Sequence, residues 1–83
     1  MNAYNTVWLI DKKLEIYGSK GDIVSLLPFT PVVSGVDTVN LGYPVQQGTF
    51  VMGQPYGVSN YMLGDTASIT IQEGLLLVIK ARD

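Results

Sequence analysis

The sequence predicts an all-β fold, either a small single-domain β barrel or a sandwich of short antiparallel strands. Short apolar or alternating segments recur along the chain, separated by turn residues at intervals of about 8 to 12 residues. Helical periodicity is almost absent. The 83 residues are enough for one domain. We expect residues 1–17 to form an N-terminal segment and hairpin, and residues 32–83 to form a regular strand-and-turn body.

The first half of the chain contains three expected strands. Residues 6–10 and 14–17 flank Asp11-Lys12-Lys13, which predicts a hairpin with a solvated tip. After a turn at 18–22, residues 23–27 fit either a strand or one helical turn capped at its start and stopped by Pro28, and we favour the strand. Pro28 and Pro31 predict an extended connection at an edge or a crossing point, because proline lacks the N–H that a central strand donates.

The second half is more regular. Strands are expected at 36–41, 49–52 and 57–61, with turns at 42–44, 53–55 and 64–65. Residues 66–72 alternate polar and apolar side chains, as in a half-buried strand. Residues 75–79 are apolar on both faces, which predicts a central strand or one covered by a neighbouring subunit.

The composition indicates that part of the apolar surface is covered by a partner. Apolar residues make up 47% of the chain and charged residues only 14%, and large exposed apolar patches usually mark interfaces. A core of this size seldom contributes more than roughly 3 to 5 kcal/mol, and without Cys or His neither disulfides nor the usual metal sites can add to it. We therefore expect a homotrimer or dimer, or docking on a larger surface. The apolar runs are too short for a membrane helix, and no signal segment is visible.

The charged residues argue against nucleic-acid binding and catalysis. No Lys or Arg lies between Lys20 and Lys80, whereas nucleic-acid binding requires several cations. The absence of His and Cys removes the usual general base, the thiol nucleophile and most transition-metal sites. The acids between the basic ends lie at expected turns, where solvation or turn capping explains them: Asp22, Asp37, Asp65 and Glu73. We expect no enzyme activity, no catalytic residue, no cofactor and no metal.

Aromatic and polar side chains are the expected contact residues. Tyr side chains beside Gln and Asn fit a sugar site, but they more often form the rim of a protein interface, because Tyr combines contact area with a polar tip. The interaction residues predicted from the sequence are Asn2, Tyr4, Trp8, Tyr43, Tyr56 and Tyr61.

Residues 42–81 contain an ordered series of turn segments, namely Gly42-Tyr43-Pro44-Val45, Gly48, Tyr56-Gly57-Val58, Gly64-Asp65-Thr66-Ala67 and Glu73-Gly74. This order of turns resembles that of the small all-β capsid decoration, or cement, proteins of tailed phages. The resemblance implies a compact β barrel on the outer surface of a virion, often a trimer, with the major capsid protein as partner. It implies no catalytic set.

Two other functions remain open at this stage. One is a β-barrel adhesion module that binds carbohydrate through Tyr, Gln and Asn side chains. The other is a structural subunit of a phage tail or fibre. All three readings are non-enzymatic and share the expectation of an exposed contact surface.

Overall fold

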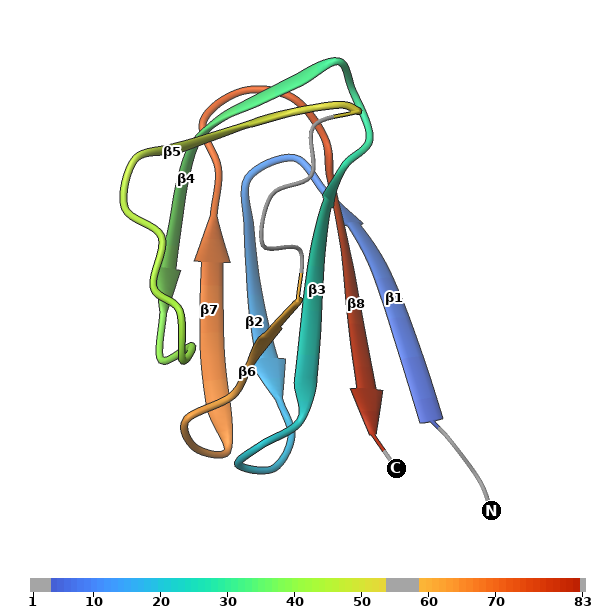
Figure 1. Cartoon of the computed structure of the whole chain (residues 1–83), viewed down its shortest axis with the longest axis vertical. Helices are drawn as coiled ribbons and strands as arrows, with labels where there is room; N and C mark the ends of the chain where they lie inside the picture. The colour runs from blue at the N-terminus through green and yellow to red at the C-terminus, as the bar shows by residue number, and fades with distance from the viewer. Residues whose placement is uncertain (1–3, 54–58, 83) are drawn as a thin grey trace.

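The structure is a β sandwich of two four-stranded antiparallel sheets (Figure 1). The computed structural model describes residues 4–53 and 59–82. The first sheet has the order β1-β8-β3-β6, and the second has the order β2-β7-β4-β5. The strands are β1 (Tyr4–Ile10), β2 (Lys13–Tyr17), β3 (Ile23–Pro28), β4 (Val32–Val39), β5 (Gly48–Val51), β6 (Ser59–Tyr61), β7 (Thr66–Thr70) and β8 (Leu76–Arg82). The all-β prediction is confirmed, and over the described residues the sheets do not close into a barrel.

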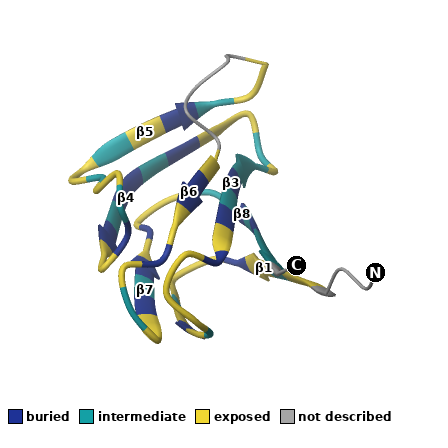
Figure 2. Cartoon of the chain, turned by 60° about the horizontal axis from the view of Figure 1, so that its bottom comes forward, coloured by how far each residue is buried: buried dark blue, intermediate teal, exposed yellow. Residues whose placement is uncertain are grey.

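The core lies between the sheets and follows the alternation along each strand (Figure 2). Ile16 and Ile69 from the second sheet and Leu76 and Val78 from the first are fully buried. Ala67, Ile69 and Ile71 point inward, as the alternating pattern of residues 66–72 predicts. β8 is central, with β1 on one side and β3 on the other, so the prediction from its two-sided apolar sequence is also confirmed.

The predicted hairpin between the first two strands is wrong. β1 pairs with β8 over seven residues, and β2 pairs with β7 over five, so β1 and β2 lie in different sheets. The connection at Asp11 and Lys12 crosses from one sheet to the other, and the Ile71 amide donates to the Lys12 carbonyl at 2.7 Å. Two separate pairings let both strands place an apolar side chain in the same core, Ile10 from β1 and Ile16 from β2.

The remaining connections largely follow the sequence prediction. Residues 23–28 are a strand, not a helical turn. The chain crosses from the first sheet to the second between Pro28 and Val32, at the crossing point that the prolines predict. β4 begins earlier than expected, and its register with β5 shifts between Val33 and Val36, where Gly35 has a φ of 66°. No described helix is long and apolar enough to cross a membrane.

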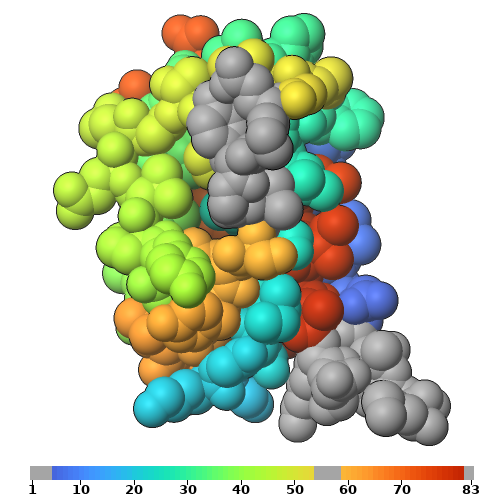
Figure 3. Space-filling model, viewed as in Figure 1, coloured from blue at the N-terminus to red at the C-terminus, as the bar shows by residue number. Residues whose placement is uncertain are grey.

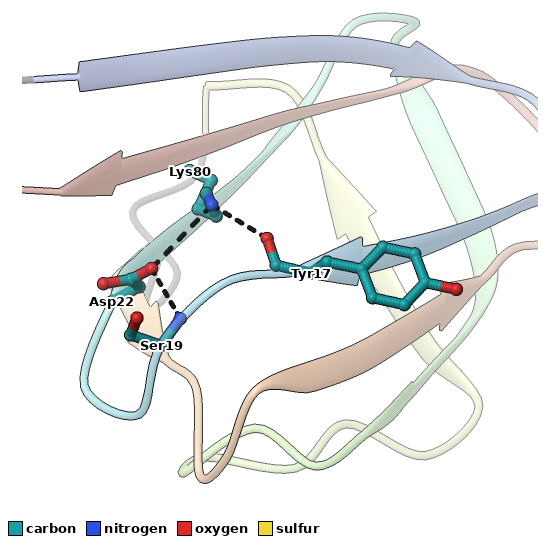
Figure 4. Close-up of polar contacts among 4 residues, drawn as sticks. All are labelled: Tyr17, Ser19, Asp22 and Lys80. Carbon is teal, nitrogen blue, oxygen red and sulfur yellow. Dashed lines mark hydrogen bonds and ion pairs between the residues drawn. The ribbon is translucent and has the colours of Figure 1, made fainter.

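A polar cluster closes one end of the sandwich (Figure 4). Lys80 on β8 donates from Nζ to the Tyr17 carbonyl at 2.9 Å and lies 3.8 Å from Asp22 Oδ2. The Ser19 amide donates to the same carboxylate oxygen at 2.9 Å. The Lys80 and Asp22 side chains are only 15% and 8% exposed. The cluster therefore ties β8 of the first sheet to the turn that follows β2 of the second.

Replacing Lys80 with methionine is expected to lower the free energy of unfolding by about 1 to 3 kcal/mol, because a buried carboxylate and a carbonyl lose their cationic partner. Chemical denaturation monitored by circular dichroism measures the loss. Lys20→Met is the control, since Lys20 is an exposed lysine of the adjacent turn. Adding Asp22→Asn to Lys80→Met should recover part of the loss. Equal stability of Lys80→Met and the parent chain would show that the cluster contributes nothing.

Candidate functional site

Two of the aromatic residues predicted from the sequence lie together on the surface. Tyr43, after β4, and Tyr61, at the end of β6, have ring centroids 5.5 Å apart and planes at 89°, an edge-to-face arrangement. Tyr43 is 66% exposed and Tyr61 36%. Figure 3 shows the light-green segment after β4 against the orange β6 region on one face of the molecule. We call Tyr43 and Tyr61 the aromatic pair.

The backbone beside the aromatic pair is held by hydrogen bonds to the neighbouring segment. Leu41 and Met62 form an antiparallel bridge, and the Gly42 amide donates to the Tyr61 carbonyl at 2.8 Å. Tyr61 covers Gly42 so closely that a Cβ there would lie 2.0 Å from its ring. The site therefore requires glycine at this position, because any larger residue would displace the ring.

The neighbouring residue of β6 contributes a buried amide. Asn60 is 4% exposed. Its Oδ1 accepts from the Tyr43 amide at 2.8 Å and from the Tyr61 amide at 3.0 Å, and its Nδ2 donates to the Tyr43 carbonyl at 2.7 Å. The buried amide of Asn60 thus bonds the backbone of both tyrosines, whose side chains remain exposed.

A concave surface separate from the aromatic pair lies on the outer face of the second sheet. It is a shallow groove of about 370 Å³ lined by Glu15, Tyr17, Val39, Asn40, Thr66, Ala67 and Ser68. The groove follows β7, whose outward side chains are short, between the longer side chains of β2 and β4. Asn40 has a φ of 67° and donates from Nδ2 to the Thr66 carbonyl at 2.6 Å.

Three polar side chains of this groove, those of Glu15, Tyr17 and Asn40, already have partners within the chain. The Tyr17 hydroxyl donates to Glu15 Oε2 at 3.0 Å, and Lys13 Nζ lies 3.6 Å from Glu15 Oε1. The hydrogen bond to Glu15, followed by the charge of that carboxylate, raises the pKa of the Tyr17 hydroxyl above its ordinary value. The one aromatic residue of the groove is thus engaged at its hydroxyl by a neighbouring carboxylate.

Of the other residues predicted as contacts, only Trp8 has a described side chain. Asn2 and Tyr56 lie outside the described residues, and Tyr4 begins β1 with a side chain that is not described. Trp8 is half-buried and packs against the core. The prediction thus named both members of the aromatic pair but missed Asn60 and Gly42, as well as the residues of the groove.

The carboxylates that the sequence places at turns do not assemble into a site. Asp22 belongs to the ion pair at the end of the sandwich, and Asp37 accepts from the backbone amide and the side chain of Gln47. Glu73 accepts at its carbonyl from the Ser34 amide. Among residues 4–53 and 59–82, no three acidic side chains lie close enough together to hold a metal ion.

Comparisons with known proteins give a family assignment. Residues 9–76 match the family described as thiamin pyrophosphokinase, vitamin B1 binding domain. The search of curated proteins gives no match. The fold is similar to solved structures of thiamin pyrophosphokinase from Bacillus subtilis, with a TM-score of 0.83 and 17% identity, and from Geobacillus thermodenitrificans, with 0.85 and 18%.

The yeast enzyme has the same fold with a TM-score of 0.68 and 19% identity. The alignments cover 95% of this chain for the two bacterial structures and 94% for the yeast structure. In the other direction, this chain spans only 38% of each bacterial protein and 27% of the yeast protein. At these identities the structural matches establish the fold, and the family match carries the assignment.

The family match overturns the resemblance to phage decoration proteins. A major capsid protein as partner, a trimer of the phage type and a location on the virion surface were implied by that resemblance and are wrong with it. The two open alternatives, an adhesion module and a tail or fibre subunit, fail for the same reason. The expectation of no enzyme activity is contradicted as well, because the family is named for a domain of a pyrophosphokinase. The chain belongs to the family of thiamin pyrophosphokinase vitamin B1 binding domains.

Proposed function

We propose that this chain binds thiamine and that the aromatic pair is the surface that contacts it. The family match supports thiamine as the ligand. Thiamine has two flat heteroaromatic rings, a neutral aminopyrimidine and a permanently cationic thiazolium. Aromatic side chains attract both kinds of ring, through stacking and through the cation–π interaction. The edge-to-face geometry of Tyr43 and Tyr61 presents two ring surfaces at right angles.

The observation that carries this proposal is the fixed and exposed position of the pair. The two rings are exposed, although the segment that carries Tyr43 is hydrogen-bonded to residues 60–63 through Asn40, Gly42 and Tyr43. Exposed aromatic side chains on a rigid support lose little conformational entropy when a ligand binds. The groove of the second sheet has one aromatic residue, Tyr17, and its hydroxyl is already bonded to Glu15.

We further propose that the pyrophosphoryl donor is held by another part of the enzyme, whether joined to this chain or separate from it. Transfer of a phosphoryl group depends on cations that neutralise the phosphates. The aromatic pair lies within the stretch that has no Lys or Arg, between Lys20 and Lys80. The chain also spans a minor part of the pyrophosphokinases to which it is similar in fold. The role of this chain is then to bind and orient thiamine.

Isothermal titration calorimetry of this chain with thiamine tests the proposal. We expect saturable binding of one thiamine per chain, and weaker binding of thiamine pyrophosphate, whose negative charges find no cation at the pair. With ATP and Mg²⁺ present, we expect no conversion of thiamine by this chain alone. Absence of thiamine binding under conditions in which the chain is folded would contradict the proposed function.

A further inference from the structure

We infer that Asn60 is a positioning residue, which fixes the aromatic pair in its edge-to-face geometry through the backbone of Tyr43. The expected effect on thiamine binding rests on the proposed function. The effect of Asn60 on the geometry of the two rings does not depend on that function. Asn60 is adjacent to Tyr61 in sequence and 17 residues from Tyr43. Among the described residues, its side chain hydrogen-bonds the backbone of both members of the pair.

The side-chain amide of Asn60 bonds Tyr43 as a strand neighbour would. Its Oδ1 accepts from the Tyr43 amide at 2.8 Å while its Nδ2 donates to the Tyr43 carbonyl at 2.7 Å. Such a two-way exchange with one residue is the pattern of a hydrogen-bonded pair in an antiparallel sheet. Among ordinary side chains of this length, only a carboxamide offers a donor and an acceptor in one plane, because a carboxylate has no donor and a hydroxyl has a single oxygen.

The hydrogen bonds between Asn60 and Tyr43 help to cover the open edge of the first sheet. Residues 41–43 run antiparallel to 60–62, through the Leu41–Met62 bridge, the Gly42 amide on the Tyr61 carbonyl, and the Asn60 side chain on Tyr43. β6 is the edge strand of that sheet, so the segment covers hydrogen-bonding groups that are otherwise open. Beyond residue 43 the chain turns back to the second sheet, where the Val45 amide donates to Thr38 Oγ1. Asn60 thus holds the last residue before the chain leaves β6.

The burial of Asn60 argues that the arrangement is fixed. At 4% exposure, water cannot replace its hydrogen bonds, and an unbonded amide in such a place is costly. Among the described residues, no buried side-chain nitrogen or oxygen lacks a partner. A rotation of Tyr43 away from Tyr61 that moved its backbone would break both bonds to Asn60 together. The backbone that carries the Tyr43 ring is therefore held in place beside Tyr61 before any ligand arrives.

The direct test is the ring contact itself, measured by NMR without ligand. In the parent chain we expect cross-relaxation between the aromatic protons of Tyr43 and Tyr61. In Asn60→Ala we expect that signal to be lost while the methyl signals of the core keep their dispersion. Thr38→Val is the matched control, because Thr38 is 7% exposed and bonds the same loop at Val45 and not at Tyr43. Loss of the ring signal in both variants, or in neither, would overturn the inference.

Thiamine affinity provides a second test of the inference. Asn60→Ala should weaken thiamine binding about tenfold, since a surface that is no longer preorganised must be ordered by the ligand. In a chain that already carries Tyr43→Ala, the same substitution should change affinity very little, because residues that act as one unit are not additive. Additive effects in this cycle would contradict a positioning role.

A conservative variant extends the test where Asn60→Ala is poorly folded. In Asn60→Asp the protonated carboxyl regains an O–H donor and a carbonyl acceptor in one plane, whereas the carboxylate repels the Tyr43 carbonyl. The ring signal and the affinity should therefore recover as the pH falls through the titration of the introduced carboxyl. Two charged residues lie on the elements beside Asn60: Lys80, which is in register with Val24 next to Asn60, and Asp22, whose carbonyl accepts from the Met62 amide. Measuring the parent chain over the same pH range controls for any effect of these two charged groups. A ring signal and an affinity that do not change with pH in Asn60→Asp would contradict the inference.

The two proposals can fail separately. If the ring signal depends on Asn60 but thiamine does not bind, the proposed function is wrong and the structural role of Asn60 stands. If thiamine binds through Tyr43 and Tyr61 but the Asn60 variants keep the ring contact and full affinity, the proposed function stands and the positioning role is wrong.

Discussion

Replacing Ile69 with alanine is expected to leave most of the protein unfolded at room temperature. Ile69 is fully buried on β7, between Leu14 of β2 and Thr38 of β4. Truncating a buried isoleucine costs about 2 to 5 kcal/mol. A domain of this size holds roughly 3 to 5 kcal/mol in total, and this chain has no disulfide to add to it.

Chemical denaturation monitored by circular dichroism measures the effect of Ile69→Ala. Val39→Ala is the control, because Val39 lies on the neighbouring strand of the same sheet and is 63% exposed. The control should change the free energy of unfolding by less than about 0.5 kcal/mol, as is usual for surface positions. An unchanged denaturation midpoint in Ile69→Ala would mean that the core between the sheets is not the main source of stability.

Removing the aromatic pair is expected to abolish measurable thiamine binding. Each single substitution, Tyr43→Ala or Tyr61→Ala, should weaken binding about tenfold, the scale of one cation–π or stacking contact. The double variant should lose more than either single variant. Both rings are exposed, so the chain should remain folded, with a change in unfolding free energy below about 1 kcal/mol.

Tyr17→Ala is the matched control for the aromatic pair. Tyr17 and Tyr43 are equally exposed, each at 66%, but Tyr17 lines the groove of the second sheet. Titration calorimetry of all variants with thiamine gives the comparison. We expect full affinity in Tyr17→Ala. Loss of binding there, with Tyr43→Ala unaffected, would place the ligand in the groove.

The strands with a strong pattern of their own were predictable from the sequence, whereas their partners were not. The alternation of residues 66–72 and the two-sided apolar run of 75–79 depend on neighbours in sequence, and the structure confirms both as β7 and β8. The partners of β1 and β2, in contrast, depend on which strands distant in sequence can form the longer run of paired residues with them. The short connection at Asp11 and Lys12 predicts a hairpin, but in the structure β1 pairs with β8 and β2 pairs with β7.

The candidate site was predictable in part. Tyr43 and Tyr61 follow from composition, since tyrosine combines contact area with a polar tip. Asn60 could not be assigned, because its partners lie 17 residues away. Gly42 was read as a turn glycine, although its place is set by the Tyr61 ring above it. One signal was available, an Asn directly before a Tyr at an expected strand, but it has no meaning until the segment at 41–43 is known to lie beside it.

The mistaken resemblance has a physical origin. It rested on the spacing of turn glycines, and turns impose glycine for reasons of backbone geometry that unrelated β folds share. Gly74 shows this, with a φ of 92° and the Val32 carbonyl 2.4 Å from where a Cβ would lie. A glycine of this kind indicates that the chain turns sharply between two strands. It does not indicate the family to which the protein belongs.

The most direct test of the account is a thiamine titration of the isotope-labelled chain, followed residue by residue by NMR. Thiamine binding at the aromatic pair predicts that the largest shift changes fall on Gly42, Tyr43, Asn60 and Tyr61, with Glu15, Tyr17 and Ser68 in the groove unchanged. Shift changes centred on the groove, or none at saturating thiamine, would contradict the claim that the aromatic pair holds the vitamin.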